Sequence, residues 1–333
     1  MGKIKIGILG ATGAVGREMR TVLEERGFPA DEVRFIASPK SAGLCLPFCG
    51  ESIPVIEASD RAFSGLDLVL GAASRDVALH FAPAIKASGA VFVDNSSAFR
   101  LEPSVPLVVP EINPKDALSH AGIVANPNCT TIITLVAIHA LAKESPVEAI
   151  IASSYQAVSG AGANGPKELL AQTAAIAAGQ TPIPQVFPYP IAYNVIPQIG
   201  GEEYAGYTSE EMKMQNEGRR ILHLPELKAS CTCVRVPVIR SHSVSVTLRT
   251  RETISAERAR TLIAKAPGCR LADDLASACH PMPLHTSQQD LVYVGRIRKD
   301  LTQERGLCLW CCGDQLRKGA ATNAVQIAEL LIP

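Results

Sequence analysis

Short apolar runs that end in small or polar residues recur along the first 128 residues of the chain. They are KIKIGIL (3–9), EVRFIAS (32–38), LDLVLGAA (66–73), AVFVDNSS (90–97) and GIVANPN (122–128). Apolar residues at helical spacing occupy two of the intervals, REMRTVLEERG (17–27) and RDVALHFAPAIKASG (75–89). Strands that alternate with helices predict an α/β fold with a parallel sheet covered on both faces. Ligands of such sheets bind at the carboxyl ends of the strands.

The pattern changes after Cys129. A helical segment, IITLVAIHALAKE (132–144), leads into the run VEAIIASSYQAVSGAG (147–162) and then into a Pro-rich crossing (181–201). Two later runs alternate apolar and polar residues and are expected to be strands of an antiparallel or mixed sheet with one solvent-facing side, CTCVRVPVI (231–239) and HSVSVTLRT (242–250). The last segment, DQLRKGAATNAVQIAELLI (314–332), is predicted to be one amphipathic helix.

Composition excludes several classes of function. The chain has 333 residues, of which 47% are apolar and 5% aromatic, and its 32 basic residues equal its 32 acidic residues. No basic surface for nucleic acid or an anionic membrane is expected. No run of about 18 apolar residues predicts a membrane span. Ten cysteines without a secretory signal indicate a reduced, cytoplasmic thiol pool.

A metal site is not expected. The one suggestive spacing, Cys308-x-x-Cys311-Cys312, lacks a suitable second pair of ligands, because Cys231-x-Cys233 also lies in a strand-like apolar run.

Glycines 10, 13 and 16 form G-x-x-G-x-x-G between the first predicted strand and helix. Such a turn lets the backbone approach a pyrophosphate at a helix N-terminus, although a tight turn without ligand would use the same residues. The second strand ends in Ser38, Lys40 and Ser41 and has no carboxylate there. Because an acidic residue at this point usually binds the ribose of NAD, its absence favours NADP; the alternative is an ordinary surface turn.

Cys129 follows the turn Asn126-Pro127-Asn128 at the predicted start of a helix. The helix dipole favours an anion there, so the thiol pKa should fall and the sulfur could act as a nucleophile. His139 lies about 15 Å along the same helix and is a poor acid–base partner.

The acid–base partner has more than one candidate. His242 sits between two predicted strands, where it and Arg235 could point into one cleft, while His280 and His285 beside a proline loop remain alternatives. Arg100, at the end of another strand, is either an anion clamp or a solvated loop arginine.

Many of these residues belong to a known pattern. The chain resembles aspartate-semialdehyde dehydrogenase of the bacterial type over nearly its whole length. The matching runs are GATGAVG, SAG, VDNSSAFR, VPEIN, NPNCTT, SYQAVSGAG, FPYPIAYNVIPQIG, EEMKM, CVRVPV, SHS and GAATNAVQIAE.

The resemblance implies two domains. Residues 1–128 and about 314–333 would form a Rossmann-type NADP-binding domain, and residues 129–313 an α+β catalytic and dimerisation domain with a mixed sheet. The expected assembly is a homodimer or a dimer of dimers.

The resemblance also implies a role for individual residues. The implied catalytic residues are the nucleophile Cys129, the acid–base His242, and Gln156 and Asn128, which orient the reacting groups. The implied substrate ligands are Arg235 and Glu210 for the amino-acid carboxylate and amine, and Arg100 and Lys213 for phosphate. The implied NADP ligands are Gly10, Thr12, Gly13, Ala14, Val15, Gly16, Ser38, Lys40, Ser41, Ser159, Gly160 and Asn323.

The implied reaction is the NADPH-dependent conversion of aspartyl phosphate to aspartate semialdehyde and phosphate through a cysteine thioester. Three positions depart from the pattern. Ser241 replaces the glycine that often precedes the histidine, Val244 replaces the glutamate of the Ser-Glu pair that often follows it, and Leu44 replaces a lysine that often follows SAG.

Two alternative functions are weighed against this one. N-acetyl-glutamyl-phosphate reductase usually has its cysteine in a Pro-Gly-Cys-Tyr context, which Asn128-Cys129-Thr130 does not match. An inactive NADP-binding paralogue should have lost the nucleophile or its partners, yet Cys129, Gln156, Arg235 and His242 are all present.

Overall fold

The computed structural model describes residues 4–332 and contains two compact units. Unit 1 ends at Asn128 and resumes at Gly319, whereas unit 2 spans Cys129–Lys318. The sequence placed the return to the first domain at about residue 314, somewhat before Gly319. Lys3, the first residue of the first predicted strand, lies outside the described residues.

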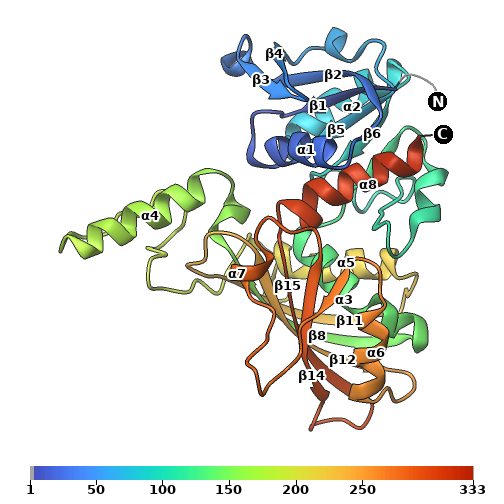
Figure 1. The fold of residues 1–333 in the computed structure, drawn as a ribbon, viewed down its shortest axis with the longest axis vertical. Helices are drawn as coiled ribbons and strands as arrows, with labels where there is room; N and C mark the ends of the chain where they lie inside the picture. The colour runs from blue at the N-terminus through green and yellow to red at the C-terminus, as the bar shows by residue number, and fades with distance from the viewer. Residues whose placement is uncertain (1–3, 333) are drawn as a thin grey trace. The chain divides into compact units, whose positions relative to one another are not determined.

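Unit 1 contains a seven-stranded sheet in the order β3-β4-β2-β1-β5-β6-β7, in which all neighbours are parallel except the edge pair β3–β4 (Figure 1). Its strands are β1 (Ile4–Leu9), β2 (Ala30–Ala37), β3 (Cys45–Phe48), β4 (Glu51–Glu57), β5 (Leu68–Gly71), β6 (Val91–Asp94) and β7 (Ile123–Ala125). Its helices are α1 (Ala14–Glu25), α2 (Arg75–Ala87) and α8 (Thr322–Leu331), with short turns η1 (Pro39–Ser41), η2 (Asp60–Phe63) and η3 (Pro114–Ser119). The prediction of a parallel α/β sheet is confirmed.

Helices α1 and α8 share one hydrophobic core with the sheet. Ile6 and Ile8 of β1 pack in a buried cluster with Met19 of α1 and Val325 of α8. The last segment of the chain therefore completes the first unit, because its apolar side chains cover a face of the sheet that would otherwise be exposed.

The prediction of a single helix over residues 314–332 is wrong at its start. The carboxylate of Asp314 accepts hydrogen bonds from the backbone N–H groups of Leu316 and Arg317, which fixes a turn there. A π-helical turn, η5 (Arg317–Ala321), follows, and α8 begins only at Thr322.

Unit 2 is built on a mixed sheet in the order β11-β8-β12-β15-β14-β13. Its strands are β8 (Val147–Gln156), β11 (Lys228–Arg235), β12 (His242–Thr250), β13 (Cys269–Leu271), β14 (Val292–Lys299) and β15 (Gly306–Gly313). β8 and β11 are parallel, whereas β12 is antiparallel to both of its neighbours, so the prediction of a mixed sheet is confirmed.

Three helices cover one face of this sheet. They are α3 (Cys129–Glu144), α5 (Ser209–Ile221) and α6 (Ala256–Ala264), which contact one another or the strands. The short α7 (Pro283–Thr286) lies at the end of β15 on the other face, where the Thr286 hydroxyl contacts Cys312 Sγ at 3.1 Å. Along β8 the even-numbered residues from Ile150 onward are buried, whereas Ile151 and Tyr155 are 59% and 37% exposed. Side chains alternate across a strand, so the odd-numbered positions define an open face.

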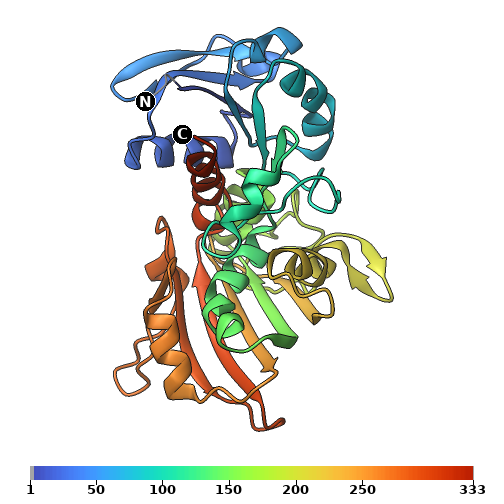
Figure 2. The ribbon, with the colours of Figure 1, turned by 90° about the vertical axis from the view of Figure 1, so that its right-hand side faces the viewer.

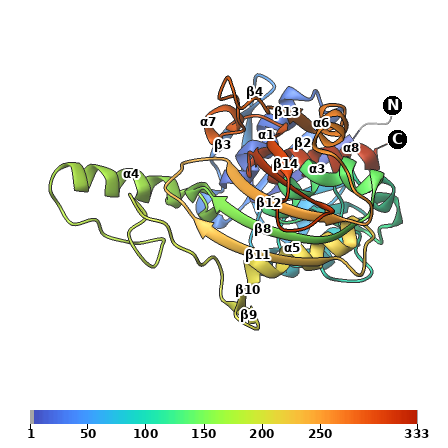
Figure 3. The same cartoon turned by 90° about the horizontal axis from the view of Figure 1, so that it is seen from below.

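Two parts of unit 2 project from the sheet. A hairpin of β9 (Glu202–Tyr204) and β10 (Tyr207–Thr208) stands out just before α5, coloured yellow in Figure 2. Helix α4 (Asn164–Ala177) extends beyond the edge of the sheet with the Pro-rich segment beside it (Figure 3). A turn, η4 (Val158–Ala161), joins the end of β8 to this arm.

Candidate active site

The Gly-rich turn joins β1 to α1 as the sequence predicts. Gly10 has a φ of +88°, and a Cβ there would lie 2.7 Å from the carbonyl oxygen of Ala72. A Cβ at Gly16 would lie 2.3 Å from the carbonyl oxygen of Gly10, so only glycine lets α1 approach the turn this closely. The N–H groups of the first turn of α1, which follows Gly13, are therefore available to an anion.

A pocket of about 420 Å³ opens at the carboxyl ends of β1, β2 and β5. It is lined by Gly10, Thr12, Gly13 and Ser38 together with an apolar side formed by Leu9, Ala37, Pro39, Ala58, Ala72, Ala73, Val77 and Phe81. The polar turn suits phosphates and the apolar side suits a flat ring, so the residues present fit a dinucleotide.

The remaining predicted cofactor residues of unit 1 lie at different distances from this pocket. Ser41 is beside it, because the Thr12 hydroxyl donates to the Ser41 hydroxyl at 3.3 Å, and Lys40 is an exposed residue of η1. Ala14 and Val15 begin α1. Asn323 is fully buried and is not among the residues that line the pocket.

Asn323 instead ends a chain of amides inside unit 1. Its Nδ2 donates to Asn126 Oδ1 at 2.6 Å, and Asn126 Nδ2 donates to Asn95 Oδ1 at 2.6 Å. Arg100 is buried and donates to the carbonyl oxygen of Asn95 at 2.8 Å. The buried turn of Arg100 is thus connected with α8 through asparagine side chains, and the solvated-loop alternative for this arginine is wrong.

Cys129 is the first residue of α3, a helix of 16 residues, and is half-buried. The sequence therefore correctly predicted its place at a helix N-terminus. Asn128, immediately before it, is buried. The charge of Cys129 acts on Arg235, where it opposes the lowering of the arginine pKa by burial.

The register of three neighbouring strands brings the predicted side chains of unit 2 together. Gln156 and Arg235 are paired at the carboxyl ends of β8 and β11, and His242 begins β12 on the other side of β8. All three side chains are buried and belong to the face that the helices cover. Gln156 and Arg235, which are 79 positions apart along the chain, thus become neighbours through the pairing of β8 with β11.

Ala157 connects His242 with Arg235. Its backbone N–H donates to His242 Nδ1 at 3.0 Å, and its carbonyl oxygen accepts from Arg235 Nη1 at 2.7 Å. Since Nδ1 accepts a hydrogen bond, the neutral ring carries its proton on Nε2. Burial and then the charge of Arg235 lower the pKa of His242 to about 3, so the ring is neutral at pH 7.

Glu210 and Lys213 on α5 complete this group. Glu210 Oε1 accepts from Gln156 Nε2 at 3.2 Å, and Glu210 Oε2 accepts from Lys213 Nζ at 2.7 Å. The carboxylate also supports the charge of Arg235, whose pKa burial lowers. The cluster therefore offers a cation and an anion, as recognition of an amino-acid zwitterion requires.

The glycine at position 160 is part of the same cluster. A Cβ on Gly160 would lie 2.8 Å from Arg235 Nη1 and 3.2 Å from His242 Cε1. Ser159 is buried and its hydroxyl accepts a short hydrogen bond from the side chain of Gln315. Gly160, which the sequence assigned to the cofactor, thus lies directly beside the histidine and the arginine. Ser159, which has the same assignment, is the residue before it in the chain.

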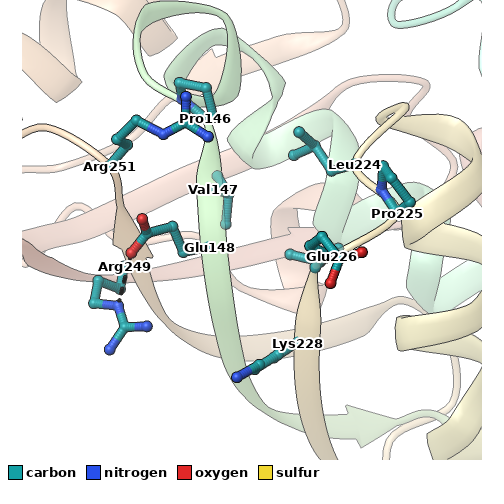
Figure 4. Close-up of a pocket in the computed structure, with 10 residues that line it drawn as sticks. Pro146, Val147, Glu148, Leu224, Pro225, Glu226, Lys228, Arg249 and Arg251 are labelled. Carbon is teal, nitrogen blue, oxygen red and sulfur yellow. Dashed lines mark hydrogen bonds and ion pairs between the residues drawn. The ribbon is translucent and has the colours of Figure 1, made fainter.

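A second pocket, of about 390 Å³, lies at the other end of β8 (Figure 4). Its lining includes Val147, Glu148, Lys228, Arg249 and Arg251. Val147 and Gln156 begin and end the same strand, so this pocket is about 30 Å from the clustered side chains. Its chemistry is separate from theirs.

Comparisons with known proteins agree with this arrangement. Residues 5–120 match the model of the semialdehyde dehydrogenase NAD binding domain, and residues 138–318 match the semialdehyde dehydrogenase dimerisation domain. The aspartate-semialdehyde dehydrogenase of Synechocystis sp. is 49% identical over 99% of this chain and 97% of the relative. That of Bacillus subtilis is 43% identical over 98% of this chain and 97% of the relative. The chain belongs to the aspartate-semialdehyde dehydrogenase family.

Solved structures of the family have the same fold. Aspartate semialdehyde dehydrogenase II of Vibrio cholerae, complexed with ASA, matches with a TM-score of 0.97 and 40% identity over 99% of this chain and 98% of that chain. The enzyme of Candida albicans with NADP matches with a TM-score of 0.77 and 25% identity over 99% of this chain and 98% of that chain. Membership of this family makes the chain an oxidoreductase with a nicotinamide-dinucleotide domain. Within residues 4–332, no helix has the length and apolar character needed to cross a membrane.

Sequence reasoning missed several residues around these sites. Val77 and Phe81 of α2 line the pocket of unit 1, and their i, i+4 spacing on one helix face was a usable signal. Ala157 acts through its backbone, and the ring of Phe187 lies over the guanidinium of Arg235. Neither role leaves a mark in the sequence, because both depend on which strand ends become neighbours.

Proposed function

We propose that the chain catalyses the NADPH-dependent reductive dephosphorylation of L-4-aspartyl phosphate to L-aspartate 4-semialdehyde and phosphate. This step belongs to the biosynthesis of the aspartate-derived amino acids lysine, methionine and threonine and of diaminopimelate. The observation that carries the proposal is the side-by-side placement of Arg235, Gln156 and His242 on the face covered by α3, which Cys129 begins. The names of the relatives support the substrate.

The chemistry begins at Cys129, whose thiolate attacks the acyl carbon of the substrate. The bond between that carbon and the phosphate oxygen then breaks, which releases phosphate and leaves a thioester on the sulfur. NADPH, when bound, supplies the hydride that reduces the thioester. Breaking the carbon–sulfur bond finally releases the aldehyde and restores the thiolate.

An oxyanion develops at the reacting carbon in both halves of this reaction. His242 holds a proton on Nε2 because Nδ1 accepts from Ala157, so Nε2–H can donate a hydrogen bond to that oxygen. Gln156 Nε2 is a second donor, and the contact with Glu210 holds its amide in place. Asn128, next to the nucleophile, is assigned a role in orienting the substrate.

The amino-acid part of the substrate is assigned to two side chains. Arg235 binds the α-carboxylate through its planar guanidinium, and Glu210 binds the ammonium group. Lys213, which contacts Glu210, and Arg100 are assigned to phosphate. With this assignment, the carboxylate and the phosphate of the substrate bind to different cationic side chains and therefore at different positions.

Cofactor binding is assigned to the pocket of unit 1. Gly10, Thr12, Gly13 and the start of α1 from Ala14 to Gly16 would hold the pyrophosphate, and Ser38, Lys40 and Ser41 the 2′-phosphate of NADP. Ser159, Gly160 and Asn323 keep their assignment to the cofactor from the family resemblance. The Candida albicans relative, whose structure contains NADP, supports this choice over NAD.

We assign the dimer contact to the open face of the sheet in unit 2, since that unit matches the family's dimerisation domain. Ile151, Tyr155 and Trp310 lie at odd-numbered positions of β8 or at the matching position of β15, and the rings of Tyr155 and Trp310 are 5.3 Å apart. A face with exposed apolar and aromatic side chains suits a second copy of the chain. A dimer of dimers and a cytoplasmic location stay predictions of the sequence.

The direct test measures NADPH formation in the reverse direction with phosphate and NADP. Purified protein would be given L-aspartate semialdehyde or N-acetyl-glutamate semialdehyde in separate assays. We expect phosphate-dependent turnover of the first compound alone, and at least about a thousandfold loss in Cys129→Ser with NADP binding unchanged, because the covalent step is lost.

Other outcomes would change the assignment. Turnover of the acetylated compound would move it to N-acetyl-glutamyl-phosphate reductase. NADP binding without turnover of either compound would favour an inactive paralogue.

A further inference from the structure

The Pro-rich segment between α4 and β9 has no part in the chemistry described so far. Two buried side chains of α4, one helical turn apart, hold it in place. The carboxylate of Glu168 accepts from the backbone N–H groups of Gln185, at 3.1 Å, and Val186. The Oε1 atom of Gln172 accepts from the backbone N–H groups of Ile191 and Ala192 at 2.8 and 3.1 Å.

Between these two anchors lies Phe187, which is almost fully buried. It packs in a small hydrophobic cluster with Val158, Leu169, Ile191 and Ile196, apart from the main sheet. A Cβ on Gly165 would lie only 3.4 Å from the Phe187 ring, so the first turn of α4 also closes on it. The ring therefore has little freedom to change its position.

The Phe187 ring lies over the guanidinium of Arg235, with the Cζ atom of Arg235 5.8 Å from the ring centroid. The same arginine donates from Nη1 to Ala157 and exchanges both backbone hydrogen bonds with Ile196, at 2.8 and 3.0 Å. The ring limits the positions that the guanidinium can adopt on this side, and the Nη1 contact limits its rotation.

We propose that Phe187, held by Glu168 and Gln172, is a positioning and specificity-determining residue that orients Arg235 for the α-carboxylate of the substrate. This inference rests on the proposed function, since it presumes an amino-acid substrate bound by Arg235. A bidentate contact with a carboxylate needs both partners in one plane. An arginine side chain without the Phe187 ring beside it would have to find that orientation anew in each binding event.

The test compares two aldehydes in the reverse reaction, L-aspartate semialdehyde and 3-aminopropanal, which lacks only the α-carboxylate. Phe187→Leu keeps an apolar side chain but removes the ring, and Phe187→Tyr keeps the ring. Tyr189→Leu is the matched control, because Tyr189 lies in the same segment and is exposed.

We expect Phe187→Leu to lower kcat/KM for L-aspartate semialdehyde roughly tenfold, mainly through KM, as loss of a desolvated cation–π contact implies. The same variant should change kcat/KM for 3-aminopropanal less than about twofold, since no carboxylate is bound. Phe187→Tyr should restore the wild-type preference, and Tyr189→Leu should retain it.

A second variant covers the case in which Phe187→Leu does not fold, as judged by circular dichroism. Glu168→Gln leaves the ring in place but weakens its anchor, and it should cause a smaller loss that is again confined to L-aspartate semialdehyde. Equal losses on both aldehydes, or no loss in either variant, would overturn the inference.

A failure of the proposed function has a different signature. Wild-type protein that binds NADP but does not turn over L-aspartate semialdehyde with phosphate would overturn the proposed function, and this inference with it.

Discussion

The buried histidine of the cluster makes the stability of the protein depend on pH. Burial and the charge of Arg235 lower the pKa of His242 from 6.5 to about 3, while Glu210 opposes this shift. The unfolded chain therefore binds a proton that the folded chain does not accept between these two pH values. The contribution of His242 to the free energy of unfolding is therefore fully present above pH 6.5 and is lost as the pH falls toward 3.

We expect the denaturant midpoint of the wild type to fall between pH 7 and pH 4 with a contribution from His242 of up to about 1.4 kcal/mol per pH unit. His242→Gln should remove that contribution, because an amide does not titrate but can still accept from Ala157. His285→Gln is the control, since His285 is exposed. Parallel pH profiles for the wild type and His242→Gln would contradict the prediction.

Ser241, which precedes this histidine, stands where the family often has glycine, and its φ of +74° explains why glycine suits the position. Two hydrogen bonds compensate for the strain. The Ser241 N–H donates to Gln315 Oε1 at 2.8 Å, and its hydroxyl contacts the Ser287 hydroxyl at 3.1 Å. The departure from the family pattern is thus tolerated locally.

Alanine usually makes a folded protein more stable than glycine at the same position, and we expect the opposite order of stability at position 241. Ser241→Ala keeps the left-handed strain and loses the hydroxyl, whereas Ser241→Gly loses the hydroxyl but relieves the strain. We expect the glycine variant to be more stable than the alanine variant by roughly 1 kcal/mol in urea unfolding. An alanine variant as stable as the glycine variant would show that the backbone is not strained here.

At the scale of elements, we expect the turn after β2 to select the cofactor. η1 presents Lys40 next to Ser38 and Ser41, near the pocket that Thr12 lines. No carboxylate lies within η1 or at its flanking Ser38, so Lys40 is the charged residue of this turn. The nearest acidic strand residue is Glu57 of β4, which pairs with Ala37.

Reversing that charge should change cofactor preference. Lys40→Glu should lower kcat/KM for NADP at least about tenfold through loss of a phosphate contact, and leave kcat/KM for NAD within about twofold. Lys115→Glu, at an exposed lysine of η3, serves as the control. Equal losses with both cofactors would mean that Lys40 does not recognise the 2′-phosphate.

We assign different purposes to the two faces of the strands in unit 2. Even-numbered positions of β8 and β12 lie on the face that the helices cover and include Gln156, the last residue of β8, and His242, the first residue of β12. Odd-numbered positions such as Ile151 and Tyr155 form the open face. Catalysis and assembly are thus assigned to opposite faces of one sheet, so a substitution on the open face can alter assembly without touching the cluster.

For the whole molecule, Ile151→Asp should dissociate the dimer. Ile151 lies in the middle of the open face, opposite Thr247 of β12, and an unpaired carboxylate there would be buried on association. Sedimentation should show a dimer dissociation constant raised at least about a hundredfold. Leu301→Asp is the control at a side chain 95% exposed in the loop between β14 and β15. An unchanged dimer in Ile151→Asp would place the contact elsewhere.

Much of this protein is determined by local sequence. Glycines 10, 13 and 16 specify a turn that admits a phosphate, because the backbone must come close to the next strand and the next helix. The short apolar runs specify parallel strands, since a strand buried on both faces cannot alternate. The turn before Cys129 places the sulfur at a helix N-terminus, and this could be read without the fold.

Only the tertiary structure decided which histidine joins the cluster and where the last helix begins. Local context favoured His242 but left His280 and His285 as alternatives, and the pairing of β12 with β8 places His242 beside Gln156 and Arg235. The contact of Phe187 with Arg235 and the space beside Gly160 likewise depend on segments that meet through the sheet. Sequence periodicity specifies which face a residue occupies, but strand register decides its neighbours, because register is set by packing over the whole sheet.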